Sequence, residues 1–215
     1  MSDKKSFYYQ IKFFAGHGFE VIAPDFPGFG LSAAIDGEWS VGDYANWLFA
    51  FVSGSVLNRP HIIAHSFGAR VALKALSENN FADRLVITGG AGIVKARSPA
   101  YLRRVRTYRL VKRFAPRFAE RHFGSAEYRT LSPIMRESYK KIVNEDLRSC
   151  ASVICNKTLL LYGKDDVVTP PSEEGKIFSQ LIADSRFQTM SGSHFCFSEY
   201  PELFNEIVYS FFTED

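Results

Sequence analysis

The chain has 215 residues, 46% of them hydrophobic and 23% charged, which are ordinary values for a globular protein with a core of useful size. No apolar run approaches the roughly 18 residues that a membrane-spanning helix needs, and the polar N-terminus lacks a signal-type segment, so we expect a cytoplasmic location. The three cysteines, Cys150, Cys155 and Cys196, are odd in number and lack metal-type CxxC spacing, so we expect reduced thiols in place of a disulfide framework and no metal site.

The net charge of +3 is distributed unevenly along the chain. Residues 95–157 hold 16 of the 26 Lys and Arg and only 5 of the 23 Asp and Glu, so this stretch carries +11 and the rest of the chain −8. Such a shift in composition predicts an inserted segment of different character.

Outside that stretch, short apolar runs alternate with segments of helical period. Strands are predicted at 19–23, 61–64, 85–88, 158–162 and 186–189, and helices at 7–15, 41–53, 68–77, 172–182 and 201–212. This alternation, with strands apolar on both faces, predicts a parallel α/β sheet. Residues 97–148 show helical segments only, broken near Pro116, Gly124 and Pro133, and are predicted to leave the sheet as a helical excursion.

The apolar run at 61–64 leads directly into the predicted helix at 68–77, with Ser66 at the turn and the small residues Ala64 and Gly68 two positions to either side. So tight a turn strains the serine backbone and exposes its hydroxyl above a helix N-terminus, whose N–H groups receive negative charge. The pattern indicates a G-x-S-x-G nucleophile elbow in which Ala64 replaces the first glycine. The alternative is an ordinary serine N-cap.

A serine hydroxyl attacks at neutral pH only when a base takes its proton. Asp165 and Asp166 follow the predicted strand at 158–162, and His194 follows the strand at 186–189. Because the carboxyl ends of parallel strands meet at one edge of a sheet, we expect the serine, an acid and the histidine to converge there, in that chain order.

With these features the sequence resembles the α/β-hydrolase superfamily, in particular its capped single-domain members. These include esterases, thioesterases, carbon–carbon bond hydrolases and cofactor-free haloperoxidases. The resemblance extends from about residue 8 to residue 212. It rests on four motifs: Asp25-Phe26-Pro27-Gly28-Phe29-Gly30-Leu31-Ser32, the Ser66 elbow, Gly163-x-x-Asp166-x-x-x-Pro170 and Gly192-Ser193-His194.

The resemblance implies a three-layer α/β-hydrolase fold whose core, residues 1–93 and 158–215, is interrupted by a helical lid at 94–157. It implies that Ser66 is the nucleophile, that His194 is the general base and that Asp166, rather than Asp165, orients His194. The Phe67 N–H is then an oxyanion-hole donor.

The implied activity is hydrolysis of an ester, thioester or related carbonyl group in a small-molecule acyl substrate, with no metal or organic cofactor. The positive charge of the lid has three interpretations: a solvated helical face, attraction of anionic substrates, or contact with an acidic membrane surface or nucleic acid. No nucleic-acid reader motif accompanies the charge, so we expect no nucleic-acid partner.

Members of this superfamily open with additional strands, the third of which ends in a His-Gly loop that supplies the second oxyanion donor. Here the predicted helix at 7–15 resembles the helix after that loop, so the sequence implies an N-terminally truncated form. A late start site, a truncated gene, or a chain that rearranges or borrows a strand would account for it. We expect the strand at 19–23 to pair with that at 61–64 or to stand apart from it.

The alternative function is a catalytically impaired fragment or a non-catalytic small-ligand-binding member of the same fold.

Overall fold

The computed structural model describes residues 3–94, 99–115, 128 and 131–214. Within them, four parallel strands form one sheet in the order β1-β2-β3-β4. Ile62 lies beside Leu85, Leu85 beside Thr158, and Thr158 beside Ser185. The strands are β1 (Ile62–His65), β2 (Arg84–Thr88), β3 (Lys157–Gly163) and β4 (Ser185–Met190). These four strands were predicted to within one residue at each end.

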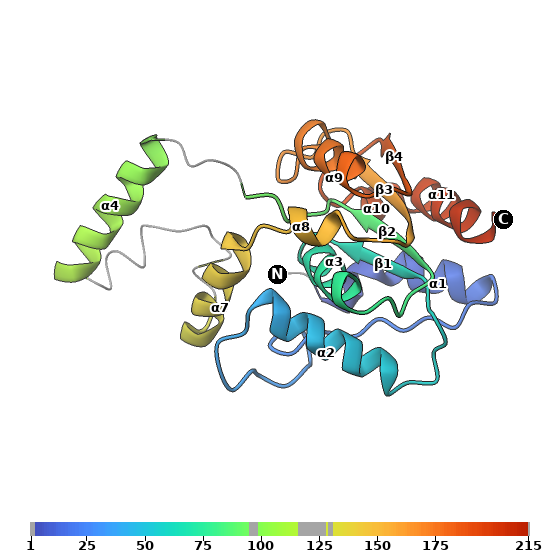
Figure 1. Cartoon of the computed structure of the whole chain (residues 1–215), viewed down its shortest axis with the longest axis horizontal. Coiled ribbons are helices and arrows are strands. Elements are labelled where there is room, and N and C mark those ends of the chain that lie inside the picture. Colours follow the sequence, from blue (N-terminus) through green and yellow to red (C-terminus); the bar gives the residue numbers. More distant parts are fainter. Residues whose placement is uncertain (1–2, 95–98, 116–127, 129–130, 215) are drawn as a thin grey trace.

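Helices cover both faces of the sheet (Figure 1). The side chains of β2 and β3 alternate between the two faces, which explains why these strands are apolar throughout. Leu85, Ile87, Leu160 and Tyr162 pack with α3 (Phe67–Glu78) and α9 (Lys176–Leu181). Val86, Leu159 and Leu161 pack with α1 (Tyr8–Gly16), α10 (Cys196–Glu199) and α11 (Pro201–Thr213). The predicted three-layer α/β architecture is therefore confirmed.

A further layer of packing covers α3 on its outer side. The helix α2 (Val41–Ser53), which is capped by Ser40 and Asp43, contributes Val41 and Tyr44 to a small cluster with Val71 of α3. Ile142 of α7 (Pro133–Asn144) completes this cluster. A 3-10 turn η1 (Lys4–Phe7) precedes α1.

The strand predicted at 19–23 is wrong. This segment is extended, but within the described residues its backbone joins no sheet, and its one backbone hydrogen bond runs from the Phe19 N–H to the carbonyl of Phe14. Side-chain packing holds it instead: the Phe19 ring lies 6.4 Å from that of His61 and 6.4 Å from that of Phe212. The apolar side chains of residues 19–23 therefore reflect packing against α1 and α11. Of the two expected arrangements, the segment stands apart from β1.

Between β2 and β3 the described residues form helices and no strand, as predicted for residues 97–148. It contains α4 (Pro99–Phe114), α7 and the short α8 (Arg148–Ala151), and we call residues 95–145 the helical insertion. Pro133 opens α7 after the N-cap Ser132; the breaks predicted near Pro116 and Gly124 lie outside the described residues.

The helix predicted at 172–182 is divided into a π-helical turn, η2 (Pro171–Gly175), and α9. Among the helices that the structure describes, none combines the length and hydropathy required to cross a membrane.

Candidate active site

Ser66 lies at the abrupt turn between β1 and α3, and its backbone is strained. Its φ and ψ angles are 49° and −106°, in a region that non-glycine residues rarely occupy. Its N–H donates to the carbonyl of Thr88 at the end of β2, 3.2 Å away, which ties the turn to the sheet. The elbow expected from Ala64, Ser66 and Gly68 is thus present in backbone geometry, whereas a simple N-cap is not, since the Ser66 side chain caps no N–H of α3.

Three side chains from three loops at the carboxyl edge of the sheet form one hydrogen-bonded chain. His194 Nε2 lies 3.1 Å from Ser66 Oγ, and His194 Nδ1 lies 2.8 Å from Asp166 Oδ2. A carboxylate only accepts, so Nδ1 carries the proton of the neutral imidazole, and Nε2 presents its lone pair to the serine hydroxyl. The structure brings together the three residues that the sequence singled out.

Asp166 is held in place by its own loop. Oδ1 accepts the N–H groups of Val168 and Thr169 at 2.8 and 2.9 Å, and Oδ2 accepts the Thr169 hydroxyl at 2.8 Å. Burial alone would raise the pKa of this carboxyl, but the hydrogen bonds from His194 and Thr169 lower it below its ordinary value. Asp166 is therefore anionic at neutral pH and fixed in orientation.

Asp165, the rival acid, is exposed, whereas Asp166 is buried. The Asp165 backbone N–H donates to the carbonyl of Gly192, 3.0 Å away. Asp165 therefore supports the turn through its backbone.

His65, the residue before Ser66, packs against His194. Its Nε2 lies 2.9 Å from the backbone carbonyl of His194, and the two imidazole rings are 4.6 Å apart. Burial, followed by the proximity of His194, lowers the pKa of His65 to about 4. A neutral His65 donates to the His194 carbonyl and so holds the backbone of the histidine loop.

The lowered pKa of His65 predicts a pH dependence of stability. The unfolded chain, with a histidine pKa near 6.5, binds more protons than the native state between pH 6.5 and pH 4, so the free energy of unfolding falls as the pH is lowered through this window. The fall due to His65 amounts to about 3 kcal/mol. Urea unfolding at pH 7 and pH 4.5 should show a much smaller difference for His65→Gln than for the wild type. Equal differences would contradict the assignment.

Gly163, the last residue of β3, permits the acid and histidine loops to meet. A Cβ at this position would lie 2.2 Å from the carbonyl oxygen of Ser193 and 2.3 Å from that of Gly192. Both contacts are with backbone, so the loop that carries His194 would have to move.

We therefore expect Gly163→Ala to lower the free energy of unfolding by roughly 1–3 kcal/mol and to reduce ester turnover by displacing His194. Thermal unfolding and steady-state kinetics measure the two effects. Gly37→Ala is the matched control, because a Cβ at Gly37 meets nothing within 4 Å. An unchanged Tm and turnover in Gly163→Ala would refute this role.

Phe67 begins α3, immediately after Ser66. Within the described residues its N–H has no protein acceptor, as befits the first turn of a helix. This N–H is therefore available to an oxygen bound next to Ser66, the position predicted for an oxyanion donor.

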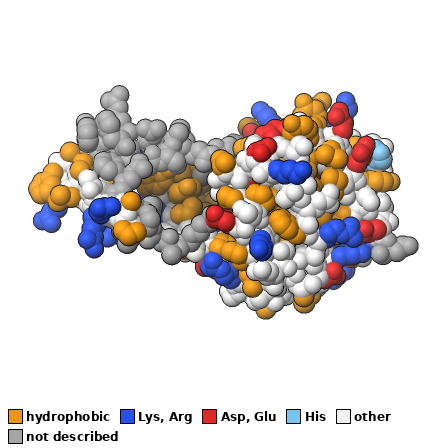
Figure 2. Space-filling model, turned by 90° about the horizontal axis from the view of Figure 1, so that it is seen from above, with side chains coloured by type: hydrophobic (Ala, Val, Ile, Leu, Met, Phe, Trp, Pro, Cys, Tyr) orange, Lys and Arg blue, Asp and Glu red, His pale blue; other side chains and the backbone are white. Residues whose placement is uncertain are grey.

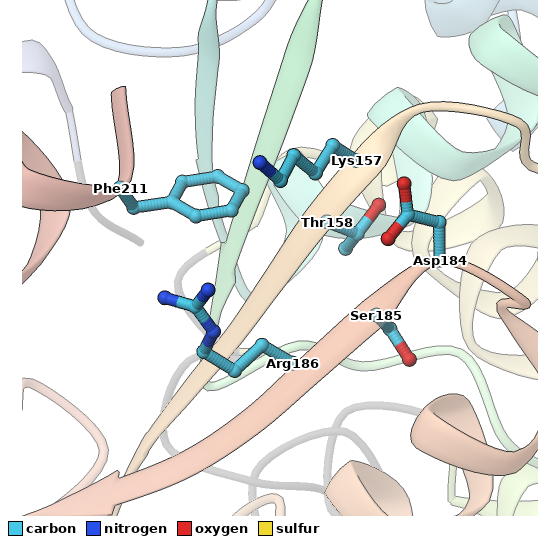
Figure 3. Close-up of a pocket in the computed structure, with 6 residues that line it drawn as sticks. All are labelled: Lys157, Thr158, Asp184, Ser185, Arg186 and Phe211. Carbon is cyan, nitrogen blue, oxygen red and sulfur yellow. The ribbon is translucent and has the colours of Figure 1, made fainter. Parts of the chain in front are cut away.

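Two surface cavities lie away from these residues. One, of about 250 Å³, is lined by residues at the amino-terminal ends of β3 and β4 together with Phe211, at the edge of the sheet opposite to Ser66 (Figure 3). Its cations are already engaged: Arg186 makes two 3.1 Å contacts with the Glu214 carboxylate, and Lys157 lies 3.4 Å from it. The other cavity, of about 440 Å³, lies by the loop at 27–36 and the side chains of Trp39 and Trp47. Neither is lined by a residue of the candidate site.

Sequence reasoning did not identify Thr169 or Gly163 as supporting residues. A hydroxyl residue three positions after an aspartate is a signal for the local turn that Thr169 makes, but only the structure shows that its hydroxyl reaches the Oδ2 atom that faces His194. No group of three His, Cys, Asp or Glu side chains in the described part of the chain is arranged to hold a metal ion.

Residues 2–207 match the sequence model of the alpha/beta hydrolase family. The chain is similar in structure to an esterase from Exiguobacterium antarcticum (TM-score 0.78, 21% identity) and to a bromoperoxidase from Bacillus anthracis (TM-score 0.79, 17% identity). It is also similar to an enol-lactonase from Burkholderia xenovorans (TM-score 0.75, 22% identity). Each of these similarities covers 99% of this chain and 88% of the other.

Among curated proteins, an uncharacterised protein of Mycobacterium bovis is 36% identical over 78 residues, which are 36% of this chain and 23% of that protein. The matched stretch thus spans about a quarter of that relative's length. Because the family model covers nearly the whole sequence, the chain belongs to the alpha/beta hydrolase family.

Proposed function

We propose that the protein is a serine hydrolase that cleaves an ester, thioester or related carbonyl substrate with Ser66 as nucleophile. The observation that carries this proposal is the continuous chain from Ser66 Oγ through His194 to the buried Asp166, with separations of 3.1 and 2.8 Å. Nucleophile, base and orienting acid lie within hydrogen-bond reach of one another, which is the geometry that activates a hydroxyl.

In the proposed reaction, His194 Nε2 takes the proton of Ser66 as Oγ attacks the substrate carbonyl. The anionic Asp166 stabilises the imidazolium that forms and keeps its Nδ1 proton in place. The Phe67 N–H stabilises the negative charge on the carbonyl oxygen, and His194 then passes its proton to the leaving group. Water activated by His194 attacks the acyl-enzyme and releases the acid, restoring the free Ser66 hydroxyl.

Membership of the alpha/beta hydrolase family supports the proposal that the protein hydrolyses a small carbonyl compound. Similar structures named as an esterase and an enol-lactonase support an acyl group as the point of attack. We assign residues 94–157 as the lid over this site, because α7 packs on the outer side of α3, whose first turn follows Ser66. Choice of substrate then depends on the lid and not on the catalytic residues.

The direct test is covalent trapping. A fluorophosphonate probe should label the wild-type protein on one residue, Ser66, as located by peptide mass spectrometry, and p-nitrophenyl acetate should be hydrolysed with an initial burst of nitrophenol. Ser152→Ala, which removes an exposed serine, is the control and should be labelled like the wild type. Labelling that persists in Ser66→Ala would assign the nucleophile elsewhere. No labelling and no turnover in the folded wild type would favour the non-catalytic alternative.

A further inference from the structure

The helix α4 is strongly basic, and four of its arginines share one side. Its sixteen residues include six Lys or Arg and no Asp or Glu. Four of the arginines, Arg103, Arg106, Arg109 and Arg113, are exposed. At 100° per residue, they lie within about 120° of the helix circumference. No carboxylate of the same helix neutralises this stripe.

The same side of α4 exposes two large apolar side chains. Leu110 is 61% exposed and Phe114 is 77% exposed. On the helical projection Leu110 falls between Arg106 and Arg103, and Phe114 falls just beyond Arg103. We call these six residues (Arg103, Arg106, Arg109, Leu110, Arg113 and Phe114) the α4 face.

The opposite side of α4 is different. Of the side chains described on that side, Val105, Tyr108 and Val111 are half-buried, whereas every member of the α4 face is exposed. Figure 2 shows hydrophobic and basic side chains together on the lobe at the left, which holds α4, with no acidic side chain among those coloured there.

We propose that the α4 face is a docking surface for an anionic lipid bilayer. Guanidinium groups next to exposed Leu and Phe match the surface of such a membrane, where phosphates lie directly above hydrocarbon. Charge complementarity selects anionic over neutral lipid, and the two apolar side chains enter the acyl boundary. A basic amphipathic helix of this kind lies on a membrane and does not cross it.

Docking in this way would tether the protein, which we propose above to be a hydrolase, to the membrane surface. The insertion that carries α4 leaves the sheet just after β2, at the carboxyl edge where Ser66, Asp166 and His194 meet. Figure 1 shows α4 at one end of the longest axis, with the sheet toward the other. A hydrolase held there would meet substrates that partition into lipid.

The test is co-sedimentation of the full chain with vesicles. We expect binding to phosphatidylcholine vesicles that contain about 30 mol% phosphatidylglycerol, little binding to pure phosphatidylcholine, and loss of binding as salt is raised. Changing all four arginines of the α4 face to Gln should weaken the partition constant by about fivefold for each arginine. Leu110→Ala with Phe114→Ala should weaken it roughly tenfold while the salt dependence remains.

The matched control removes four positive charges elsewhere: Lys5, Lys12, Arg59 and Lys176, all exposed, are changed to Gln and should bind close to the wild type. Equal binding to neutral and anionic vesicles, or an equal loss in this control, would overturn the proposal. Tight binding to a double-stranded DNA oligonucleotide that is insensitive to the Leu110 and Phe114 changes would also overturn it, in favour of a nucleic-acid surface. Sedimentation does not depend on turnover, so the proposed hydrolase activity can fail without affecting this result.

Discussion

Ser66→Ala and His194→Ala are each expected to lower turnover of an activated ester by several orders of magnitude, and the double variant should lose little more. The reason is that the two side chains act in one event: Nε2 takes the proton only as Oγ attacks, so either loss removes the whole nucleophilic step. Steady-state kinetics on p-nitrophenyl esters, with all variants assayed at the same pH, provides the comparison.

The control for this experiment is Ser152→Ala, and circular dichroism should show that every variant remains folded. Losses that multiply in the double variant would mean that Ser66 and His194 act independently. That outcome would contradict a triad even if both residues proved important.

The second large effect is expected at Asp166. In Asp166→Asn, the amide nitrogen must face either His194 Nδ1 or the backbone N–H groups of Val168 and Thr169, all of which present hydrogens to the carboxylate in the wild type. Where the nitrogen faces His194, the imidazole must keep its proton on Nε2 and cannot accept one from Ser66. Turnover should fall by roughly 10³–10⁴-fold.

Asp165→Asn is the matched control for Asp166→Asn, because it makes the same change at the neighbouring residue. Its side chain is exposed and its backbone makes the turn, so turnover should stay close to that of the wild type. Kinetics of the two single variants under the same conditions decides between them. The reverse ranking would move the acid by one position and break the connection to His194 described above.

Most of the sheet could be predicted from sequence because its central strands β2 and β3 are apolar on both faces, as buried parallel strands are. The segment at 19–23 carries a similar apolar pattern, yet packing against Phe212 and Phe14 produces it without any strand partner. Composition cannot tell these two origins apart, since hydrogen-bond partners far along the chain do not appear in a local pattern.

For the candidate site, residue types and spacing were sufficient to select Ser66, Asp166 and His194, since each follows a strand that ends at the same edge. The supporting contacts were not accessible in this way. His65 reaches the carbonyl of His194, 129 positions along the chain, and Gly163 matters because another loop's backbone fills the space of its absent side chain. Such contacts depend on tertiary structure alone.

The helical insertion leaves and rejoins the core at nearly the same point. The Leu147 N–H donates to the carbonyl of Gly92 at 2.8 Å, and the Val94 N–H donates to Asp146 Oδ2 at 2.9 Å. Because the ends of the insertion lie so close together, its length has little effect on the stability of the core, since loop-closure entropy grows only slowly with length.

Insertions of other lengths and sequences could therefore be exchanged at this point while β2, β3 and the residues at their ends kept their positions. Under the proposed assignment of this insertion as a lid, the chemistry and the choice of substrate can evolve separately. The same frame would accept a new lid as other proteins accept an inserted domain.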